Sequence, residues 1–358
     1  MKRLETLRRE IDQIDREILS LLNRRAELAR EVGEIKKKEG LPFYVPGREA
    51  KILAKLEELN RGPLPPESIR AIFREIISAC RALEEPTKVA FLGPQATFTH
   101  LAALKHFGTS SDLRPRDSIT EVFDEVEKER VDYGVVPIEN SIEGIVNYTI
   151  DMFLDTDLKI SGEVFVPVNL HLMSRENSLS DVKRVYSHRH ALAQARKWLS
   201  ENLPDAELVE VSSTAKAAEI ASSERGSAAI ASEAAALLYD LNILAKNIQE
   251  LTRNFTRFLI IGKRDSDYPS GRDKTSIMFS TRHRAGALFK ALQPFAVYDV
   301  NLTKIESRPT KKKPWEYVFF VDLDGHRKED RVAKALKELE ESCSFFKVLG
   351  SYPAGFKE

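Results

Sequence analysis

Hydrophobic residues in the first part of the chain follow a helical pattern. They recur at heptad spacing from Leu4 to Ile35, and glycine and proline gather at residues 40–46 and 62–66. The pattern predicts three helices, and an apolar stripe this regular must pack against other helices. The predicted helices span residues 4–39, 47–60 and 67–84. We therefore expect an all-α domain over residues 1–86.

Residues 87–265 follow a different pattern, in which short apolar runs alternate with helical stretches. Runs of this kind, when they are bounded by turn residues, predict buried strands. The predicted strands lie at residues 89–93, 133–138, 184–188, 228–232 and 257–262. Strands that alternate with helices are typical of an α/β domain. Residues 263–274 are polar and rich in turn residues, so we expect a linker there.

The pattern changes again towards the end of the chain. Residues 275–351 read, in order, as strand, helix, strand, strand, helix and strand. This is the order of the ferredoxin-like α+β module. We expect the module to form a third domain over residues 273–358. The chain is thus predicted to be multidomain, with an all-α, an α/β and an α+β part.

Composition argues against several classes of function. The 358 residues include 55 Lys and Arg against 55 Asp and Glu, which argues against a nucleic-acid partner or a membrane-surface partner. No apolar run approaches the roughly 20 residues of a membrane span. Because the charged start also lacks the apolar core of a secretory signal, we expect a cytoplasmic protein. Two cysteines, Cys80 and Cys343, and seven scattered histidines form no metal motif, and no GxGxxG or P-loop indicates a cofactor.

Arg25 interrupts the apolar stripe of the first predicted helix. A buried arginine is costly unless an anion meets it, so Arg25 indicates either a structural ion pair or an anion-binding site. Lys36 lies about three turns further along, close to the same face, and favours the anion site. Arg8 lies roughly 25 Å from Arg25 along the axis and about 100° round the helix. Spacing alone favours an exposed Arg8, although an antiparallel pair of such helices could bring the partner's copy to the site.

Three segments resemble the all-helical chorismate mutases: LRREIDQIDREILSLLNRRAELAREVGEIK, PGREAKIL and IFREIISACRALE. The resemblance implies a cationic clamp of Arg25, Lys36, Arg48 and, from a second subunit, Arg8. It also implies that Glu49 holds the substrate hydroxyl. Chorismate carries two carboxylates and rearranges by a pericyclic shift, which requires a held conformer and charge stabilisation rather than covalent catalysis. Arginine grips carboxylates bidentately, and Lys36 can donate to the breaking ether oxygen.

Two positions depart from this resemblance. Val45 stands where an acidic residue can sit, which leaves Glu49 alone on the hydroxyl. Glu84 stands where a glutamine can donate to the ether oxygen, and a carboxyl group donates only when it is protonated. We therefore predict that mutase activity falls as the pH rises, and that Glu84→Gln flattens this profile.

Several polar residues of the middle segment lie at the ends of predicted strands, where α/β proteins bind ligands. Taken singly, each fits a helix cap or a turn equally well. The residues are Asn140, Ser187, Gln194, Thr256 and Arg257. As a set, together with FLGPQATFTHLAALKHFG, they resemble prephenate dehydratase. The resemblance implies two α/β lobes, like those of a periplasmic binding protein, with the site in the cleft.

The resemblance also implies a role for each residue. Prephenate loses water and carbon dioxide to give phenylpyruvate, and aromatisation drives the reaction. Thr256 is the implied proton donor to the departing hydroxyl, and Arg257 is the candidate carboxylate anchor. Asn140, Ser187 and Gln194 would orient the substrate. Because a threonine hydroxyl is a weak acid, its role depends on a concerted transition state.

This segment also departs from the dehydratase pattern. Ala96 replaces a usual glycine, which matters if the position needs a positive φ. Arg189 and His190 replace a common Pro-Gln pair. We expect His188 and His190 to be core or surface residues rather than acid–base groups or metal ligands.

The last segment resembles the ACT domain of phenylalanine-regulated dehydratases, on RHRAGALFKAL and NLTKIESRPTKKKPWEYVFFVDLDGH. Glycine before a helix leaves backbone N–H groups free for an amino-acid carboxylate. The resemblance implies feedback inhibition by phenylalanine bound between two such domains. The implied phenylalanine-binding residues are Gly286, Ala287, Leu288, Glu306, Ser307, Arg308 and Pro309.

As a combination, the three blocks resemble the bifunctional chorismate mutase/prephenate dehydratases with a C-terminal ACT domain. Chorismate and prephenate are then the expected substrates, phenylalanine the effector, and a homodimer or higher oligomer the expected assembly. Two alternatives stay open at this point. One is a dehydratase with a weakened mutase, because of Val45 and Glu84. The other is a non-enzymatic sensor of small ligands, since two-lobed folds and ACT domains both bind ligands without chemistry.

Overall fold

The computed structural model describes residues 2–40, 44, 46–282, 284–309 and 317–355. They form two compact units. The first comprises Met1–Lys88 and Phe107–Asp112, and the second comprises Val89–His106 and Leu113–Glu358. None of the helices in these residues combines the length and hydropathy that a membrane span requires.

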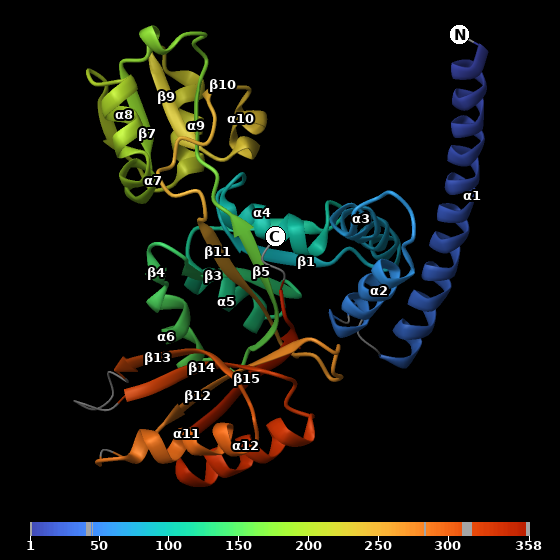
Figure 1. The fold of residues 1–358 in the computed structure, drawn as a ribbon, viewed down its shortest axis with the longest axis vertical. Helices are drawn as coiled ribbons and strands as arrows, with labels where there is room; N and C mark the ends of the chain where they lie inside the picture. The colour runs from blue at the N-terminus through green and yellow to red at the C-terminus, as the bar shows by residue number, and fades with distance from the viewer. Residues whose placement is uncertain (1, 41–43, 45, 283, 310–316, 356–358) are drawn as a thin grey trace. The chain divides into compact units, whose positions relative to one another are not determined.

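The first unit contains the three predicted helices, α1 (Lys2–Glu39), α2 (Pro46–Leu59) and α3 (Pro66–Glu84). Helix α1 packs against α3 at Gly33, where an added Cβ would lie 2.7 Å from Cγ of Glu84. The N-terminal half of α1 extends beyond α2 and α3, as Figure 1 shows. The apolar stripe of α1 is exposed along the whole helix, at Leu4, Leu7, Ile11, Ile14, Ile18, Leu21, Leu28, Val32 and Ile35. An exposed apolar stripe of this length is typical of an interaction surface.

The second unit begins with an α/β lobe. Its sheet has the order β2-β1-β3-β11-β5, and β4 pairs with β3. The strands are β1 (Lys88–Leu92), β2 (Asp112–Arg116), β3 (Tyr133–Asn140), β4 (Gly144–Ile145), β5 (Lys159–Pro167) and β11 (Phe255–Gly262). The helices are α4 (Phe98–Phe107), α5 (Ile119–Glu127) and α6 (Asn147–Asp155). Strands β3 and β11 are antiparallel, and their register places Thr256 opposite Asn140.

A second α/β lobe is inserted between β5 and β11. Its sheet has the order β10-β6-β9-β7-β8. The strands are β6 (His171–Ser174), β7 (Arg184–Ser187), β8 (Glu207–Glu210), β9 (Ser227–Ala231) and β10 (Asn242–Ala245). The helices are α7 (Arg189–Gln194), α8 (Arg196–Asn202), α9 (Thr214–Ser223) and α10 (Glu233–Tyr239). The chain thus passes twice between the lobes, which confirms the expected two-lobed arrangement.

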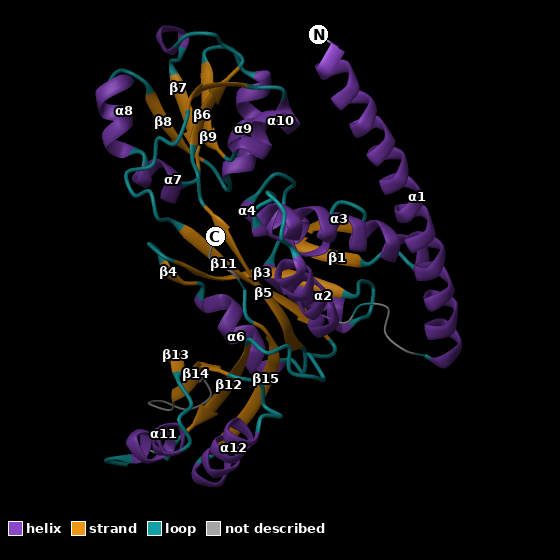
Figure 2. Cartoon of the chain, turned by 45° about the vertical axis from the view of Figure 1, so that its right-hand side comes forward, coloured by secondary structure: helices purple, strands orange, loops and turns teal. Residues whose placement is uncertain are grey.

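The C-terminal module has the predicted order of elements (Figure 2). Its antiparallel sheet has the order β13-β14-β12-β15. The elements are β12 (Asp273–Ser280), α11 (Ala287–Val297), β13 (Leu302–Pro309), β14 (Tyr317–Asp324), α12 (Asp330–Ser342) and β15 (Phe345–Pro353). The predicted fold class, with helical, two-lobed α/β and ferredoxin-like parts, is therefore confirmed.

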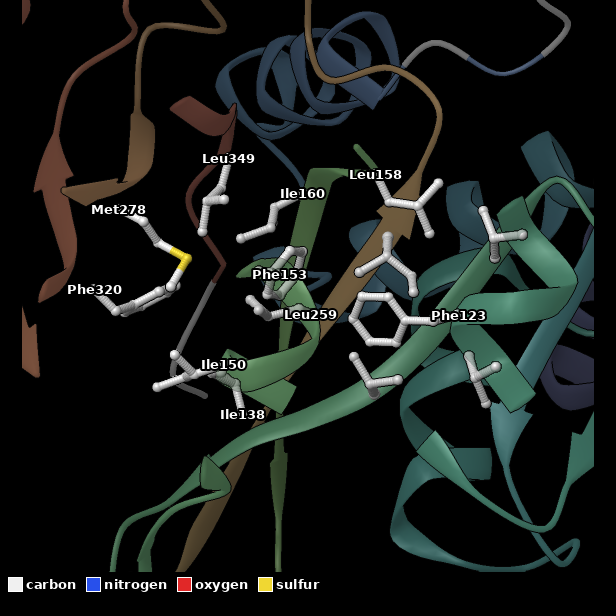
Figure 3. Packing of buried hydrophobic residues seen from close by; sticks show 14 of the residues in the cluster. Phe123, Ile138, Ile150, Phe153, Leu158, Ile160, Leu259, Met278, Phe320 and Leu349 are labelled. Atoms are coloured by element: carbon white, nitrogen blue, oxygen red, sulfur yellow. The ribbon is translucent and has the colours of Figure 1, made fainter. Parts of the chain in front are cut away.

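The C-terminal module and the first lobe share one hydrophobic core. Figure 3 shows Phe123, Phe153 and Leu259 of the lobe together with Met278, Phe320 and Leu349 of the module. Strand β15 also approaches β5 so closely that Gly350 lies against the carbonyl group of Ile160, with no room for a side chain. The lobe and the module are therefore packed as one body rather than joined by a flexible linker.

Candidate active sites

A cavity of about 240 Å³ lies among α1, α2 and α3 of the first unit. Its charged lining residues are Arg25, Lys36, Arg48, Glu49, Arg81 and Glu84. Five of these were predicted from the sequence, whereas Arg8 is not among the lining residues. Four cations against two carboxylates leave the cavity positive. Such a cavity suits a small dianion with an apolar body, since Leu28, Val32, Ile52 and Ile77 complete the wall.

Two ion pairs set the charge state of this cavity. Lys36 Nζ lies 3.5 Å from Glu84 Oε2, and Arg81 Nη1 lies 2.6 Å from Glu49 Oε1. Burial raises the pKa of Glu49, and the attraction of Arg81 opposes this increase only in part. Among the described residues, neither Arg25 nor Arg48 has an ion-pair partner. These two guanidinium groups are therefore available to carboxylates.

Sequence reasoning missed Arg81, which is buried on α3. Its guanidinium stacks over the ring of Tyr44 at 4.8 Å, and its Nη2 donates to the carbonyl oxygen of Phe107 at 2.8 Å. Arg81 lies three residues before Glu84, so helical spacing alone places the two on one face. That spacing was the signal that could have found it. Val45, the other departure named above, lies outside the described residues.

Residues 107–112 support this part of α3. The backbone N–H and the hydroxyl of Thr109 both donate to Glu75 Oε2, at 3.1 and 2.6 Å. Gly108 has a φ of 78° and lies directly on the side chain of Ser78, which leaves no space for a Cβ. These contacts explain why Phe107–Asp112 belongs to the compact helical unit although it comes later in the chain.

A larger cavity of about 720 Å³ lies in the second unit. Its lining comes from both lobes and includes the predicted residues Asn140, Gln194 and Thr256. Asn140 Nδ2 donates to Thr256 Oγ1 at 2.9 Å, as the facing register of β3 and β11 allows. Ser213 and Thr214, at the N-terminus of α9, also line the cavity, and free N–H groups at such a helix start can hold an anion.

His188 and His190 both line this cavity, although neither was predicted to be a site residue. Their rings lie edge to face with centroids 4.8 Å apart. Burial, followed by the neighbouring His190 and Arg189, lowers the pKa of His188. His188 is therefore expected to be neutral at pH 7. No cluster of His, Cys, Asp or Glu in the described residues could hold a metal ion.

Two predicted substrate contacts are absent from the cavity wall. Ser187 is fully buried, and its hydroxyl donates to the carbonyl oxygen of Ile230 at 2.7 Å. Arg257 lies on the opposite face of β11 from Thr256 and Phe258, because side chains alternate along a strand. In this structure, therefore, neither Ser187 nor Arg257 is part of the cavity wall, in contrast to the other three predicted dehydratase residues.

Arg257 instead forms the centre of a buried charge cluster. Its Nε donates to Glu163 Oε2 at 2.6 Å, its Nη1 pairs with Asp322, and its Nη2 donates to the Tyr352 hydroxyl at 3.0 Å. Lys274 also pairs with Glu163, at 2.9 Å. Because Asp322 and Tyr352 belong to the C-terminal module, the strand that carries Thr256 is joined to that module through charge.

The predicted phenylalanine-binding residues fall in two places. Gly286, with a φ of 75°, precedes α11, whose first residues are Ala287 and Leu288. The other four residues, Glu306, Ser307, Arg308 and Pro309, end β13 and alternate between its half-buried and exposed faces. Arg308 contacts α6 of the first lobe. It binds the carboxylate of Asp151 on α6 with both Nε and Nη2, at 3.1–3.2 Å.

Comparisons with known proteins assign a family to each part of the chain. Family models match residues 7–85 (chorismate mutase type II), 89–266 (prephenate dehydratase) and 275–341 (ACT domain). A bifunctional chorismate mutase/prephenate dehydratase from Aquifex aeolicus is 58% identical over 99% of this chain and 98% of its own length. Its counterpart from Pseudomonas aeruginosa is 47% identical over 98% and 97%.

The fold of the second unit is also found among solved structures. The crystal structure of a prephenate dehydratase from Arthrobacter aurescens, in complex with L-Phe, is 36% identical. It covers 75% of this chain and 90% of its own, with a TM-score of 0.70. Together with the full-length matches, these findings show that the chain belongs to the family of bifunctional chorismate mutase/prephenate dehydratases.

Proposed function

We propose that the two cavities carry out consecutive reactions. The cavity of the first unit rearranges chorismate to prephenate, and the cavity of the second unit converts prephenate to phenylpyruvate. The observation that carries the proposal is the chemistry of the two walls. The first offers unpaired arginines for a rigid dicarboxylate, and the second offers a threonine hydroxyl beside amides and a helix start.

In the mutase cavity, Arg25 and Arg48 bind the two carboxylates of chorismate, and Lys36 donates to the breaking ether oxygen. Glu49 accepts from the substrate hydroxyl, and Glu84 holds Lys36 in place through their ion pair. The rearrangement needs no covalent partner. Its acceleration comes from binding the compact conformer and from stabilising the negative charge that develops on the ether oxygen.

We propose that Arg8 reaches this cavity from a second subunit in a homodimer. The exposed apolar stripe of α1 supports this arrangement, because it runs along the helix from Leu4 past Arg25 to Ile35. An antiparallel pair of α1 helices would bury both stripes and bring each Arg8 to the cavity of the other chain. The dimer completes the cationic clamp that one chain leaves open.

In the dehydratase cavity, Thr256 donates its hydroxyl proton to the departing C4 hydroxyl group, which leaves as water. The electrons of the bond to the leaving carbon dioxide enter the ring, which becomes aromatic. Asn140 and Gln194 orient the substrate, and the start of α9 receives a carboxylate. Neither reaction requires a cofactor.

We propose that phenylalanine, the product of this pathway, inhibits the dehydratase through the ACT domain, residues 273–358. Two contacts support a route of communication: Arg308 pairs with Asp151, and Lys304 pairs with Glu139 at 2.7 Å, next to Asn140. The two cysteines are free thiols, which is consistent with a reducing cytoplasm.

A paired assay tests the proposal. Chorismate loss and phenylpyruvate formation are followed separately on purified wild type, Lys36→Ala and Thr256→Ala, with and without phenylalanine. We expect Lys36→Ala to lose only the first activity and Thr256→Ala to lose only the second. Thr120→Ala, which removes an exposed hydroxyl bonded to Tyr148, is the matched control. Near-wild-type dehydratase in Thr256→Ala would overturn the assignment of the proton donor.

A further inference from the structure

Thr256 lies at the end of a chain of four side-chain hydrogen bonds. Asn140 Nδ2 donates to Thr256 Oγ1 at 2.9 Å and also to Asn254 Oδ1 at 2.8 Å. Asn254 Nδ2 then donates to Gln194 Oε1 at 2.7 Å, and Gln194 Nε2 donates to Glu143 Oε1 at 3.2 Å. The chain thus leads from the proton donor to a carboxylate.

The direction of this chain is fixed by the backbone at one end. Asn140 Oδ1 accepts from the N–H groups of Ile142 and Glu143, at 2.9 and 3.0 Å, so its amide nitrogen must face the other way. Asn254 must then present its oxygen to Asn140 and its nitrogen to Gln194. Gln194, in turn, must present its nitrogen to Glu143, whose ionised carboxylate can only accept. Each amide therefore has one orientation that satisfies all its neighbours.

This direction matters for the hydroxyl of Thr256. An oxygen that accepts a hydrogen bond from Asn140 becomes a better donor, and its own hydrogen remains available to the substrate. The three bonds from Asn140 to Asn254, Gln194 and Glu143 all point toward the carboxylate. Glu143 therefore holds each amide in the orientation that leaves an N–H of Asn140 for Thr256. If the chain were reversed, Asn140 would present its carbonyl oxygen to Thr256 and would compete with the substrate for that hydrogen.

We propose that Asn254 and Glu143 are positioning residues for the dehydratase reaction, which keep the Thr256 hydroxyl aimed at the substrate. Asn254 is 2% exposed and does not line the cavity, so it acts only through its neighbours. Gln194 belongs to the second lobe, whereas the other members belong to the segments around β3 and β11. The chain consequently also links the second lobe to the strand that carries Thr256. This inference rests on the proposed role of Thr256.

Moving the carboxylate from position 143 to position 254 tests the hydrogen-bond chain. Asn254→Asp keeps an acceptor for Asn140 but removes the donor to Gln194, whose amide must turn and present its oxygen to the Glu143 carboxylate. Glu143→Gln alone keeps an acceptor for Gln194 and loses only the charge. In the double variant, the new amide at 143 can donate to the turned Gln194, so every bond is restored with the carboxylate moved to position 254.

We expect Asn254→Asp to lower the dehydratase kcat at least about tenfold, with KM changed less than about threefold, because ground-state binding is not its task. Glu143→Gln should lower kcat only about two- to fivefold. The double variant should regain kcat to within about threefold of Glu143→Gln, a coupling that independent residues do not show. A structural role in folding alone predicts that the two losses multiply.

Two controls keep the test decisive. The first is mutase activity, which is measured on the same preparations and shows that the polypeptide is intact. The second is Asn242→Asp, which removes an exposed side-chain hydrogen bond to Asn177 away from the cavity. If Asn254→Asp fails to fold, Gln194→Glu with and without Glu143→Gln poses the same question, because a carboxylate at 194 again faces that of Glu143.

The outcomes separate this inference from the proposed function. The proposed role of the hydrogen-bond chain would be overturned if the kcat losses of the two single variants multiply in the double variant. A kcat of Asn254→Asp within about twofold of wild type would overturn it as well. A wild-type protein that forms no phenylpyruvate, or a Thr256→Ala variant with full activity, would instead overturn the proposed function itself.

Discussion

The buried charge cluster around Arg257 makes the stability of the second unit depend on one carboxylate of the C-terminal module. Asp322 is 1% exposed and Arg257 is 4% exposed, so neither charge can recover water if the other is removed. Burial alone would raise the pKa of Asp322, but Arg257 and the hydroxyl of Ser276 hold this pKa below its ordinary value. Asp322→Asn keeps the shape of the side chain and removes its charge.

The size of the effect follows from the charges that remain. Arg257, Lys274 and Glu163 would leave one uncompensated positive charge in the core. Removal of one partner from a buried ion pair costs about 3–5 kcal/mol. For a unit of this size, that loss corresponds to a fall in Tm of about 6–20 °C. Because the pKa of Asp322 is lowered on folding, the deficit holds at neutral pH and closes only below about pH 4.

Thermal unfolding followed by circular dichroism measures this deficit. Asp324→Asn, which removes a carboxylate at the end of β14 that accepts an exposed hydrogen bond from Asn301, is the matched control and should cost less than about 0.5 kcal/mol. Combining Asp322→Asn with Arg257→Met restores the charge balance, so the double variant should be more stable than the sum of the two losses predicts. A Tm of Asp322→Asn within about 2 °C of the control would refute the reasoning.

Three further predictions concern single side chains. Glu84→Gln should keep mutase activity, because an amide at this position can donate to the ether oxygen beside Lys36, and a loss of activity in the mutase assay would exclude that role. Since burial raises the pKa of Glu49 on folding, its contribution to stability declines as the pH rises above about 4, and Glu49→Gln should show a smaller loss of Tm between pH 5 and pH 8. Ala96 has a φ of 62°, a conformation that costs roughly 1–2 kcal/mol for a residue with a Cβ. Ala96→Gly should therefore raise the Tm slightly with dehydratase kcat retained, and a lowered Tm would mean that the packing of its methyl group outweighs the backbone strain.

Most elements with a regular apolar pattern could be predicted from the sequence, since burial on one or both faces leaves a periodic signal. The predicted strand at 133–138 corresponds to β3, and that at 257–262 to β11. Strand β5 was missed because Glu163 and the adjacent Gly162 interrupt its apolar run. Glu163 is buried because Arg257 and Lys274 neutralise it, and these partners lie 94 and 111 residues away in the chain. No local pattern reveals such a pair.

The candidate sites, like the fold, could be predicted from the sequence only in part. Residues that face a cavity along a helix, such as Lys36 and Glu49, follow from helical spacing together with the family resemblance. Thr256 and Arg257 are neighbours in one motif, yet the alternation of the strand sends them to opposite faces. Which face meets the cavity depends on the partners of β11 in the folded chain, so the motif alone could not assign the two roles.

The segment Phe107–Asp112 has a consequence for how the two enzymes can be separated. It lies beyond the helical domain in the sequence, yet Arg81 donates to the carbonyl oxygen of Phe107, and Glu75 accepts from the N–H of Thr109. A gene truncated after residue 86 would encode a mutase whose α3 lacks these partners and whose Arg81 has lost one of its two hydrogen-bond acceptors. The point at which the chain can be cut without loss therefore differs from the boundary between its two activities. A minimal mutase must also contain the segment Phe107–Asp112 of the neighbouring domain.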